Sequence, residues 1–429
     1  MGLFVIVVSK QYFRQTAISC ESGYKGVILK DFEHYMQHEH GFSLPQPDAH
    51  SAAHSTRCAR YIRERVLDAG GSISFAEFMH YALYAPGLGY YSAGARKFGA
   101  DGDFVTAPEI STLFGNVLAR QCAGIIRQVD DASLLEFGAG SGKLAVDLLR
   151  ALSRHDALPR EYRIIEVSAD LRERQQRLLH DELPEFVDRV VWLDRMPDSH
   201  HGVIIANEVL DALPVERFLR REDGVRQLRV TVEGDEFVFV DEPAPEVLAM
   251  AVEAIEQDIG ASLPEGFISE VSLSAPAWVR DMAATLGQGI ALLFDYGVSR
   301  REYYASDRNE GWLRCHFRHR VHSDPLILPG IQDLTAWVDF TAVATAAVDA
   351  GLEVAGYVSQ SQFLLGGGLD EELRDIAGLP LESQLEMSGQ IKMLTLPGEM
   401  GENVKCVGLV RDTIPGLDAF GSADRTHTL

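Results

Sequence analysis

Leu134-Leu-Glu-Phe-Gly-Ala-Gly-Ser-Gly-Lys-Leu144 is the stretch that decides the expected fold of this 429-residue chain. Apolar residues run into three glycines on alternate positions, and leucines then recur at helical spacing as far as Leu152. A strand is therefore expected to turn sharply into a helix. Glycine tolerates positive φ and carries no Cβ that would keep a ligand off the turn. The first N–H groups of the helix would face an electron-rich group of that ligand.

Spacing excludes two of the three nucleotide-binding loops that begin in this way. A phosphate-binding P-loop requires glycine, four residues and then Gly-Lys-Ser/Thr, but Phe137 stands at its first glycine and Leu144 at its hydroxyl. The dinucleotide fingerprint G-x-G-x-x-G fails because Lys143 occupies its last glycine. What remains is an acid and three alternate glycines, Glu136-x-Gly138-x-Gly140-x-Gly142. This pattern is typical of the loop that binds S-adenosylmethionine (SAM) in class I methyltransferases, although an ordinary tight strand-to-helix turn has the same appearance.

A second strand favours a nucleoside ligand at this loop. Arg163-Ile-Ile-Glu166-Val-Ser168 is apolar and ends in an acid, and Glu166 lies 24 residues after Gly142. In doubly wound folds, a carboxylate about 20 residues beyond the glycine loop binds ribose hydroxyls, and its charge strengthens those hydrogen bonds. The alternative for Glu166 is a solvated acid at a strand end.

Short apolar strands and helices continue to alternate, which is the signature of a doubly wound α/β domain. We expect further strands at 190–193, 203–206, 289–294, 353–359 and 403–410, the last at the sheet edge, and helices at 170–181 and from Asp333. A hairpin at 225–240 and a helix at 244–259 would form an insertion that caps the substrate side.

Polar residues follow two of these strands directly. Asn207, Glu208 and Asp211 come after the strand at 203–206, and Asp295 and Tyr296 come after the strand at 289–294. Ligands bind beyond the carboxyl ends of strands in open α/β sheets. An asparagine and two acids there would fix a substrate nitrogen, hold its positive charge and assist loss of a proton. The competing interpretation is a capped helix start, because Asn and Asp are good caps.

The region before the glycine loop has its own pattern. From Thr56 a helical face of apolar residues ends with Leu67, and Ser74-Phe-Ala-Glu77 is a capping box that opens the next helix. A long aromatic, glycine-rich loop from Pro86 to Ser111 follows, which either folds over the ligand or connects the two regions. The expected domains are a poorly patterned extension (1–55), a helical and loop region covering the active site (56–130), a SAM-binding domain (131–411) with an insertion at about 222–285, and a tail (412–429).

Composition narrows the classes of partner. With 63 acidic and 39 basic residues the net charge is −24, which disfavours nucleic acids and anionic membranes. Five scattered cysteines without CxxC spacing argue against a disulfide framework and favour a reducing compartment. Residues 3–8 are apolar but too short to span a bilayer and lack the features of a signal peptide, so we expect a cytoplasmic protein.

A metal site is the alternative weighed for one cluster, which consists of Cys315, His316, His319 and His322. Histidines three residues apart can share a helix face. Arg314, Arg318 and Arg320 would, however, place positive charge beside a cation, and no acid is interleaved before Asp324. We therefore expect no metal.

Taken together, the motifs resemble those of the MidA family of class I SAM-dependent methyltransferases, in order over roughly residues 57–411. The segments that carry the resemblance are Gly87-x-Gly89-Tyr90-Tyr91, Gly102-Asp103-Phe104-x-Thr106-Ala-Pro108-Glu109-Ile-Ser111, Phe114-Gly115, the glycine loop, Glu166-Val-Ser168, Asn207-Glu208-x-x-Asp211-Ala-Leu-Pro214, Asp295-Tyr-Gly297, Pro329-Gly330 with Asp333-x-Thr335, and Gly398-x-Met400-Gly401. Two departures are Lys143, where a threonine is frequent, and Asn403-Val-Lys405, where the family often has Arg-Phe-Lys.

The resemblance implies a Rossmann-like, seven-stranded sheet with an antiparallel edge strand, SAM as cofactor, and protein arginine as the substrate. By match, Glu136, Gly138, Gly140, Gly142, Glu166, Thr106, Pro108 and Asn207 would bind the cofactor. Glu208, Asp211 and Asn207 would be catalytic, and Glu109, Ser111, Asp295, Tyr296 and His319 would lie on the substrate side. A small-molecule O- or N-methyltransferase and a non-catalytic, SAM-binding assembly chaperone are the alternative functions, and a homodimer is a further expectation.

Overall fold

The computed structural model describes residues 44–92, 105–374, 376–412, 417–421 and 423–429. Contacts divide the chain into residues 1–42 and residues 43–429, and every described element lies in the second unit. No helix within these described ranges has the length and apolar character needed to cross a bilayer.

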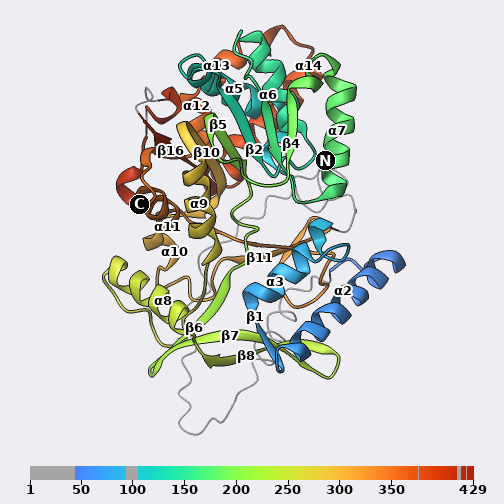
Figure 1. Ribbon diagram of the computed structural model, residues 1–429, viewed down its shortest axis with the longest axis vertical. Helices are drawn as coiled ribbons and strands as arrows, with labels where there is room; N and C mark the ends of the chain where they lie inside the picture. The colour runs from blue at the N-terminus through green and yellow to red at the C-terminus, as the bar shows by residue number, and fades with distance from the viewer. Residues whose placement is uncertain (1–43, 93–104, 375, 413–416, 422) are drawn as a thin grey trace. The chain divides into compact units, whose positions relative to one another are not determined.

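Seven strands form the main sheet in the order β15-β16-β10-β5-β2-β3-β4 (Figure 1). They span Ser133–Phe137 (β2), Tyr162–Ile165 (β3), Val190–Leu193 (β4), His200–Asn207 (β5), Leu286–Val298 (β10), Glu353–Ser359 (β15) and Val404–Arg411 (β16). β4, β3, β2, β5 and β10 pair in parallel, and the two-residue β14 (Val338–Asp339) joins the end of β10. The class I methyltransferase sheet is therefore present.

The position of the antiparallel strand differs from our expectation. β16 runs antiparallel to both β10 and β15 and lies between them, so that β15 forms the edge. The prediction of an antiparallel edge strand is wrong by one place. β16 pairs with β10, which precedes it in the chain by more than 100 residues. The alternating pattern of a strand does not indicate which strands will be its neighbours in the sheet.

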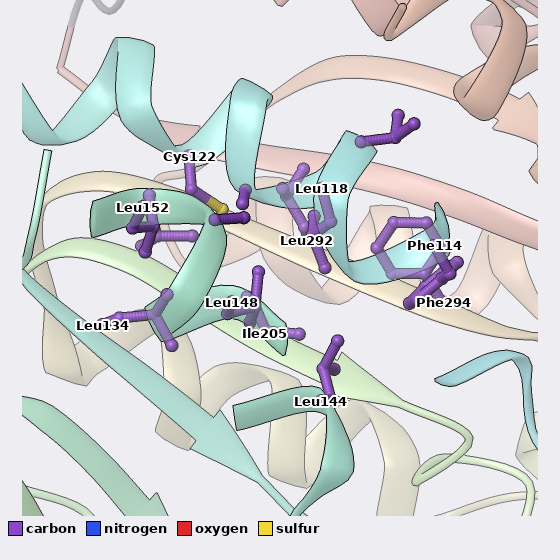
Figure 2. Close-up of a cluster of buried hydrophobic side chains, with 14 of the residues drawn as sticks. Phe114, Leu118, Cys122, Leu134, Leu144, Leu148, Leu152, Ile205, Leu292 and Phe294 are labelled. Carbon is purple, nitrogen blue, oxygen red and sulfur yellow. The ribbon is translucent and has the colours of Figure 1, made fainter. Parts of the chain in front are cut away.

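Helices cover both faces of the main sheet. Because side chains alternate along a strand, Leu134 and Ile205 face α5 and α6 whereas Leu135 and Ile204 face α9 and α11. These helices span Thr112–Ile126, Lys143–Arg154, Ser274–Thr285 and Phe340–Asp349. Figure 2 shows the leucines that follow the glycine loop packed with strand residues of the sheet, as their helical spacing predicted.

A second sheet is built largely from the predicted insertion. Its order is β1-β7-β6-β9, with β8 on β7. The strands span Ser72–Ser74 (β1), Glu216–Arg221 (β6), Gly224–Glu233 (β7), Glu236–Pro243 (β8) and Ile268–Val271 (β9), and α8 spans Glu246–Ile259. The predicted hairpin and the helix after it are confirmed. β1, however, comes from the N-terminal region, so this sheet joins two distant parts of the chain.

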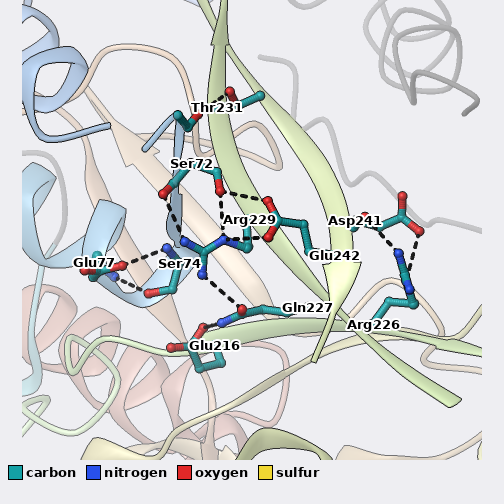
Figure 3. A network of polar contacts seen from close by, with 11 residues as sticks. Ser72, Ser74, Glu77, Glu216, Arg226, Gln227, Arg229, Thr231, Asp241 and Glu242 are labelled. Carbon is teal, nitrogen blue, oxygen red and sulfur yellow. Dashed lines mark hydrogen bonds and ion pairs between the residues drawn. The ribbon is translucent and has the colours of Figure 1, made fainter. Parts of the chain in front are cut away.

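Arg229 ties β1 to this sheet (Figure 3). Its Nε donates to Ser72 Oγ at 3.0 Å and its Nη2 to the Ser72 carbonyl at 2.9 Å. Ser72 Oγ in turn donates to Glu242 Oε1 of β8 at 2.8 Å. The helices that flank β1 are α2 (Ala49–Asp68) and α3 (Phe75–Tyr84). They share one apolar cluster with β7 and with β13 (Asp333–Ala336), and the predicted capping box of α3 is present.

The start of α2 departs from the sequence reading. Asp48 caps this helix, which begins seven residues before Thr56. His54 and Ser55 are buried, and His54 Nε2 lies 2.8 Å from the Leu88 carbonyl, so the end of the predicted extension packs against the rest of the chain. Leu67, expected on the apolar face, is 72% exposed. Residues 1–43 of the predicted extension lie outside the described residues. Gly102, Asp103 and Phe104, which carry part of the family resemblance, also lie outside them.

A small third sheet, β12-β11-β13, contains the cysteine and histidine cluster and the start of the helix predicted from Asp333. Its strands span Leu313–Phe317 (β11), Arg320–His322 (β12) and Asp333–Ala336 (β13). Cys315 and the nearby histidines therefore lie on a hairpin and share no helix face. The helix expected from Asp333 is α11, which begins only at Phe340 because Asp339 caps it.

Shorter elements complete the described fold. They are η1 (Tyr90–Ser92), α4 (Ala107–Ile110), α7 (Ala169–Glu182), η2 (Pro184–Arg189), α10 (Arg300–Tyr303), α12 (Gln360–Gly366), α13 (Leu369–Glu372), η3 (Ile376–Gly378), α14 (Leu381–Thr395), α15 (Met400–Asn403), η4 (Asp418–Phe420) and η5 (Thr426–Thr428). Phe420 fills the space that Gly356 and Gly408 leave on β15 and β16, so part of the predicted tail contributes to the core.

Candidate functional site

Three glycines carry the chain from β2 into α6. Gly138, Gly140 and Gly142 have φ of 63°, 55° and 89°, in the left-handed region that residues with a Cβ avoid. A Cβ on Gly142 would lie 3.3 Å from Gln175, and one on Gly138 would lie 3.1 Å from Val209. The predicted strand, glycine loop and helix are confirmed, and the loop lies against both α7 and the turn after β5.

A buried amide, that of Gln175 on α7, joins the parts of this half of the site. Gln175 Nε2 donates to the Gly140 carbonyl and to Glu166 Oε2, at 3.0 Å each, and its Oε1 accepts from Trp192 Nε1 at 3.0 Å. Sequence reasoning missed Gln175, because it stands in the polar run Arg172-Glu-Arg-Gln-Gln-Arg177 and only its burial distinguishes it.

The two acids predicted to contact the cofactor differ in position. Glu166 follows β3, and its Oε1 also accepts the Ser168 N–H at 2.9 Å. An ionised carboxylate can accept about four hydrogen bonds, so Glu166 is suited to bind a diol. Glu136 lies within β2, where it is 3% exposed and accepts the Tyr162 hydroxyl at 2.7 Å. Burial raises the pKa of Glu136 to about 7. It therefore supports the sheet beneath the loop.

Asp295 holds the turn after β5. Its Oδ2 accepts the backbone N–H groups of Val209, Leu210 and Asp211 at 3.1, 2.8 and 3.3 Å, and its Oδ1 accepts that of Tyr296 at 2.9 Å. Asp295, predicted on the substrate side, thus anchors the turn that carries the predicted catalytic residues.

Glu208 has a strained backbone, with φ of 53°. Its N–H donates to the Phe294 carbonyl at 2.8 Å, which fixes this conformation against β10. Strain of this kind clusters at functional sites. Asn207 Nδ2 donates to Glu208 Oε1 at 3.2 Å, whereas Asn207 Oδ1 is buried and has no partner among the described residues. A ligand that donates a hydrogen bond would satisfy this oxygen.

The carboxyl groups at this turn form an acidic cluster, defined by Glu208, Asp211 and Asp295. Burial raises the pKa of Glu208 to about 8, and nearby Asp211 adds to the effect. Burial also raises the pKa of Asp295 to about 8 and that of Asp211 well above its ordinary value. In the described parts of the chain, no lysine or arginine forms an ion pair with these three groups. A cationic ligand would offset the cost of burying their charge.

Three further residues adjoin the acidic cluster and were missed as site residues. Tyr91 donates to both oxygens of Asp333, at 3.0 and 3.1 Å, and Asp333 lies close enough to raise the pKa of Asp211. Tyr84 stacks on Tyr91 with ring centroids 5.5 Å apart and donates to the Ala212 carbonyl at 2.9 Å. Tyr91, in the described first part of the aromatic loop, therefore reaches the site. Asp333 comes from β13, and the family motif Asp333-x-Thr335 is the sequence signal that could have identified it.

The segment before α5 lies between the glycine loop and the acidic cluster. Thr106 precedes α4, and Pro108 is buried within it. Glu109 accepts a hydrogen bond from Ser141 of the glycine loop, and the Ala107 backbone acts on Glu208, where it lowers the pKa. Ser111, predicted on the substrate side, instead caps α5 by accepting the Leu113 N–H at 3.3 Å.

The two remaining residues that were predicted on the substrate side, Tyr296 and His319, lie in different places. Tyr296 lies close to the acidic cluster. Burial raises the pKa of its hydroxyl, and the nearby carboxylates of Glu208 and Asp211 raise this pKa further. His319 is exposed in the turn between β11 and β12, with φ of 59°, and within the described residues it forms no hydrogen bond or ion pair with the cluster. The described ranges contain no group of three His, Cys, Asp or Glu side chains placed to hold a metal ion.

The raised pKa of Glu208 predicts a pH-dependent cost to stability. Folding raises this pKa from 4.5 to about 8, so the folded state holds more protons than the unfolded chain between these values. The free energy of unfolding contributed by Glu208 therefore decreases as pH rises from about 4.5 to about 8. His200 acts in the opposite direction, since its pKa falls to about 4. The observable is thus the Tm of Glu208→Gln minus that of the wild type, which should grow by a few degrees from about pH 5 to about pH 8. A difference that stays constant or shrinks would contradict the assignment.

Comparison with known proteins identifies the family. The family model described as "Putative S-adenosyl-L-methionine-dependent methyltransferase" matches residues 117–358, which is more than half of the chain. This chain belongs to the MidA family of SAM-dependent methyltransferases.

Full-length relatives and a solved structure agree with this membership. Protein arginine methyltransferase NDUFAF7 of Danio rerio is 30% identical over 373 residues, covering 80% of this chain and 84% of the relative. The Drosophila melanogaster homolog is 30% identical over 400 residues, covering 85% and 87%. The crystal structure of a Burkholderia thailandensis protein bound to S-adenosyl-homocysteine (SAH) shares 40% identity and a TM-score of 0.85, covering 90% of this chain and all of that one. This MidA-family member is thus a class I methyltransferase with SAM as its cofactor.

The residues of this MidA-family site fit that cofactor. The glycine loop has no Cβ atoms where its backbone adopts left-handed φ. Glu166 directly follows the adjacent strand β3. Asn207 Oδ1 is a buried acceptor without a hydrogen-bond donor among the described residues. An adenosyl ligand with ribose hydroxyls and an amino group supplies the matching donors.

Gln175 is expected to position the cofactor site. We expect Gln175→Leu to weaken SAH binding by about 10–100-fold, because it leaves the partly buried Gly140 carbonyl and Trp192 N–H without their partner, at about 1–3 kcal/mol for each group. The matched control is Gln176→Leu, which makes the same change at the exposed neighbouring position of α7. Isothermal titration calorimetry with SAH gives both dissociation constants, and equal affinities in the two variants would remove Gln175 from this role.

Proposed function

We propose that this MidA-family enzyme transfers the methyl group of SAM to a guanidino nitrogen of an arginine side chain in another protein. One observation carries the proposal: the acidic cluster, in which Asp211 and Asp295 are buried and Glu208 is partly buried, lies beside the cofactor loop and has no cationic partner within the described residues. Guanidinium is a planar, permanently charged group with five donors, which suits a site lined by carboxylates. The names of the relatives as protein arginine methyltransferases support the same substrate.

Each residue then has a proposed role. Gly138, Gly140 and Gly142 would line the cofactor, Glu166 would accept its ribose hydroxyls, and Asn207 would accept a hydrogen bond from its amino group. Thr106 and Pro108 would cover the cofactor on the side of α4, and Glu136 would support the glycine loop from within β2. SAM supplies a methyl group on a positively charged sulfur.

Glu208 and Asp211 would hold the guanidinium so that one nitrogen points at the cofactor loop. Orientation of this kind supplies much of the acceleration of a transfer reaction. Binding of a cation lowers the pKa of Glu208 from about 8, so the group is ionised when substrate is present. A base whose pKa lies near the working pH is well matched to removal of the guanidinium proton. Asp295 would keep the turn in place.

Incubation of the enzyme and a cell extract with SAM carrying a labelled methyl group tests the proposal. We expect the label in protein, and acid hydrolysis of that protein should release methylarginine. Label in the small-molecule fraction would assign an O- or N-methyltransferase of metabolites. SAM binding without any transfer would favour the non-catalytic chaperone. Either result would overturn the proposal.

The interaction partners follow from the same proposal. The partner would be a protein whose arginine reaches the acidic cluster. The homodimer remains a prediction, as does the exclusion of nucleic acid and membrane partners by the net charge. The cytoplasmic location also remains a prediction, and the animal relatives are named as mitochondrial proteins.

A further inference from the structure

A cavity of about 350 Å³ lies between the second sheet with its helix α8 and the helices α9 and α11 of the main domain. Residues of α8, β9, α9, α10 and the segment 336–342 form its walls, and no residue of the glycine loop lines it. Apolar side chains dominate the lining, among them Val247, Ala251, Ile255, Val271 and Trp337. Pockets for small molecules run from about 300 to 1,000 Å³ and are lined mainly by apolar side chains with few polar groups. The cavity meets both conditions.

The charged side chains of the lining leave one positive charge unpaired. Arg300 pairs with Asp339 at 2.9 Å and with Asp258 at 3.1 Å, and Glu270 pairs with Arg217 at 3.1 Å, so each of these charges already has a partner. Arg280 of α9 lines the cavity, is exposed, and forms no hydrogen bond or ion pair with any described residue. The lining therefore combines an apolar interior with one available guanidinium.

The outer face of α8 adds an apolar rim. Val247, which lines the cavity, is 58% exposed, and Met250 on the same helix is 61% exposed. Met250 does not line the cavity and lies one helical turn beyond Val247. The apolar character thus continues from the interior to the surface.

We propose that this cavity binds a small monocarboxylate with an apolar body, whose carbon chain lies among the α8 and β9 side chains and whose carboxylate pairs with Arg280. The net charge of −24 opposes anions at long range. Apolar contact must therefore supply most of the affinity, and Arg280 selects the charge of the head group. The site is separate from the cofactor and acceptor sites and does not depend on the substrate proposed above.

One wall of the cavity is formed by residues that also contact the acidic cluster or the adjacent Tyr296, at the proposed site of the methyl-accepting arginine. Leu210 lines the cavity, and its N–H donates to Asp295. Trp337 also lines the cavity, and its ring centroid lies 6.2 Å from that of Tyr296. A ligand would therefore contact the back of the turn that carries Glu208 without entering the cofactor loop, so binding should persist when SAH is bound.

Calorimetric titration of the full-length protein with octanoate, octanol and octylammonium tests the proposal. Ala251→Phe on α8 and Ala342→Phe on α11 fill the cavity from two walls, because both residues line it. Gln257→Phe introduces the same side chain on the exposed side of α8 and serves as the control. Arg280→Gln removes the charge alone. Unchanged SAH binding shows that each variant is folded.

We expect one octanoate site in the wild type and in Gln257→Phe, with binding weakened at least about tenfold in both filled variants. Arg280→Gln should weaken octanoate about three- to tenfold and leave octanol unchanged. Saturating SAH should leave octanoate binding within about twofold. Three results would overturn the proposal: no octanoate binding in the wild type, full binding in either folded filled variant, or equal binding of octylammonium and octanoate. A crystal soaked with 8-bromooctanoate gives a test without variants, and bromine outside the cavity would count against it.

Discussion

Glu208→Gln is expected to lower kcat for arginine methylation by about 10²–10⁴-fold while the Kd for SAH stays within about threefold. Glutamine has nearly the same shape and can keep the hydrogen bond from Asn207 Nδ2. It cannot balance the charge of a guanidinium or take its proton. Single-turnover methylation and SAH calorimetry on the same preparation measure the two quantities.

The control for this change is Glu246→Gln, which removes a carboxylate at the exposed first turn of α8. Its kcat should equal that of the wild type. If Glu208→Gln loses SAH affinity and turnover to the same extent, Glu208 belongs to cofactor binding and the acceptor role fails. If it loses neither, the acidic cluster is not the acceptor site.

Gly142→Val is expected to weaken SAH binding at least about 100-fold. The backbone at Gly142 has φ of 89°, so any side chain is strained there, and its Cβ would lie 3.3 Å from Gln175. To relieve that contact, either the glycine loop or the Gln175 side chain would have to move. Gln175 donates hydrogen bonds to both the loop and Glu166. The loss would appear in calorimetry with SAH even at temperatures where the variant is folded.

Gly70→Val is a closely matched control. Gly70 has φ of 90°, and no atom lies within 4 Å of the position that a Cβ would take there. Both variants carry the left-handed strain of about 1–2 kcal/mol, and only Gly142→Val disturbs the cofactor site. We expect Gly70→Val to bind SAH as the wild type does, with a Tm lower by a few degrees. Equal SAH binding by the two variants would show that Gly142 contributes only through backbone strain.

The sequence predicts the structure of the glycine loop and its flanking strand and helix well because these elements are local. A strand, three alternate glycines and a leucine-patterned helix occupy consecutive residues, and their φ values follow from residue type. Glu166 follows at a separation that the doubly wound fold dictates. The turn at Asn207 was found for the same reason, since it directly follows a buried strand.

The acceptor half is less predictable because tertiary packing assembles it. Tyr91 and Asp333 are 242 residues apart in the chain, yet they share a hydrogen bond. Asp295 was predicted to contact substrate, and its burial against three backbone N–H groups makes it an anchor instead. His319 was placed by resemblance alone, and its exposed turn gives it no contact with the acidic cluster among the described residues.

The position of β16 affects how the molecule is made. Synthesis delivers β10 and β15 before the strand that pairs with both of them. Until then, β10 presents a long row of unpaired peptide groups, which is a template for association with another nascent chain. The emerging protein should therefore need a holding chaperone during the last stage of translation, and ribosomes stalled before codon 404 should yield aggregates rather than a soluble cofactor-binding fragment.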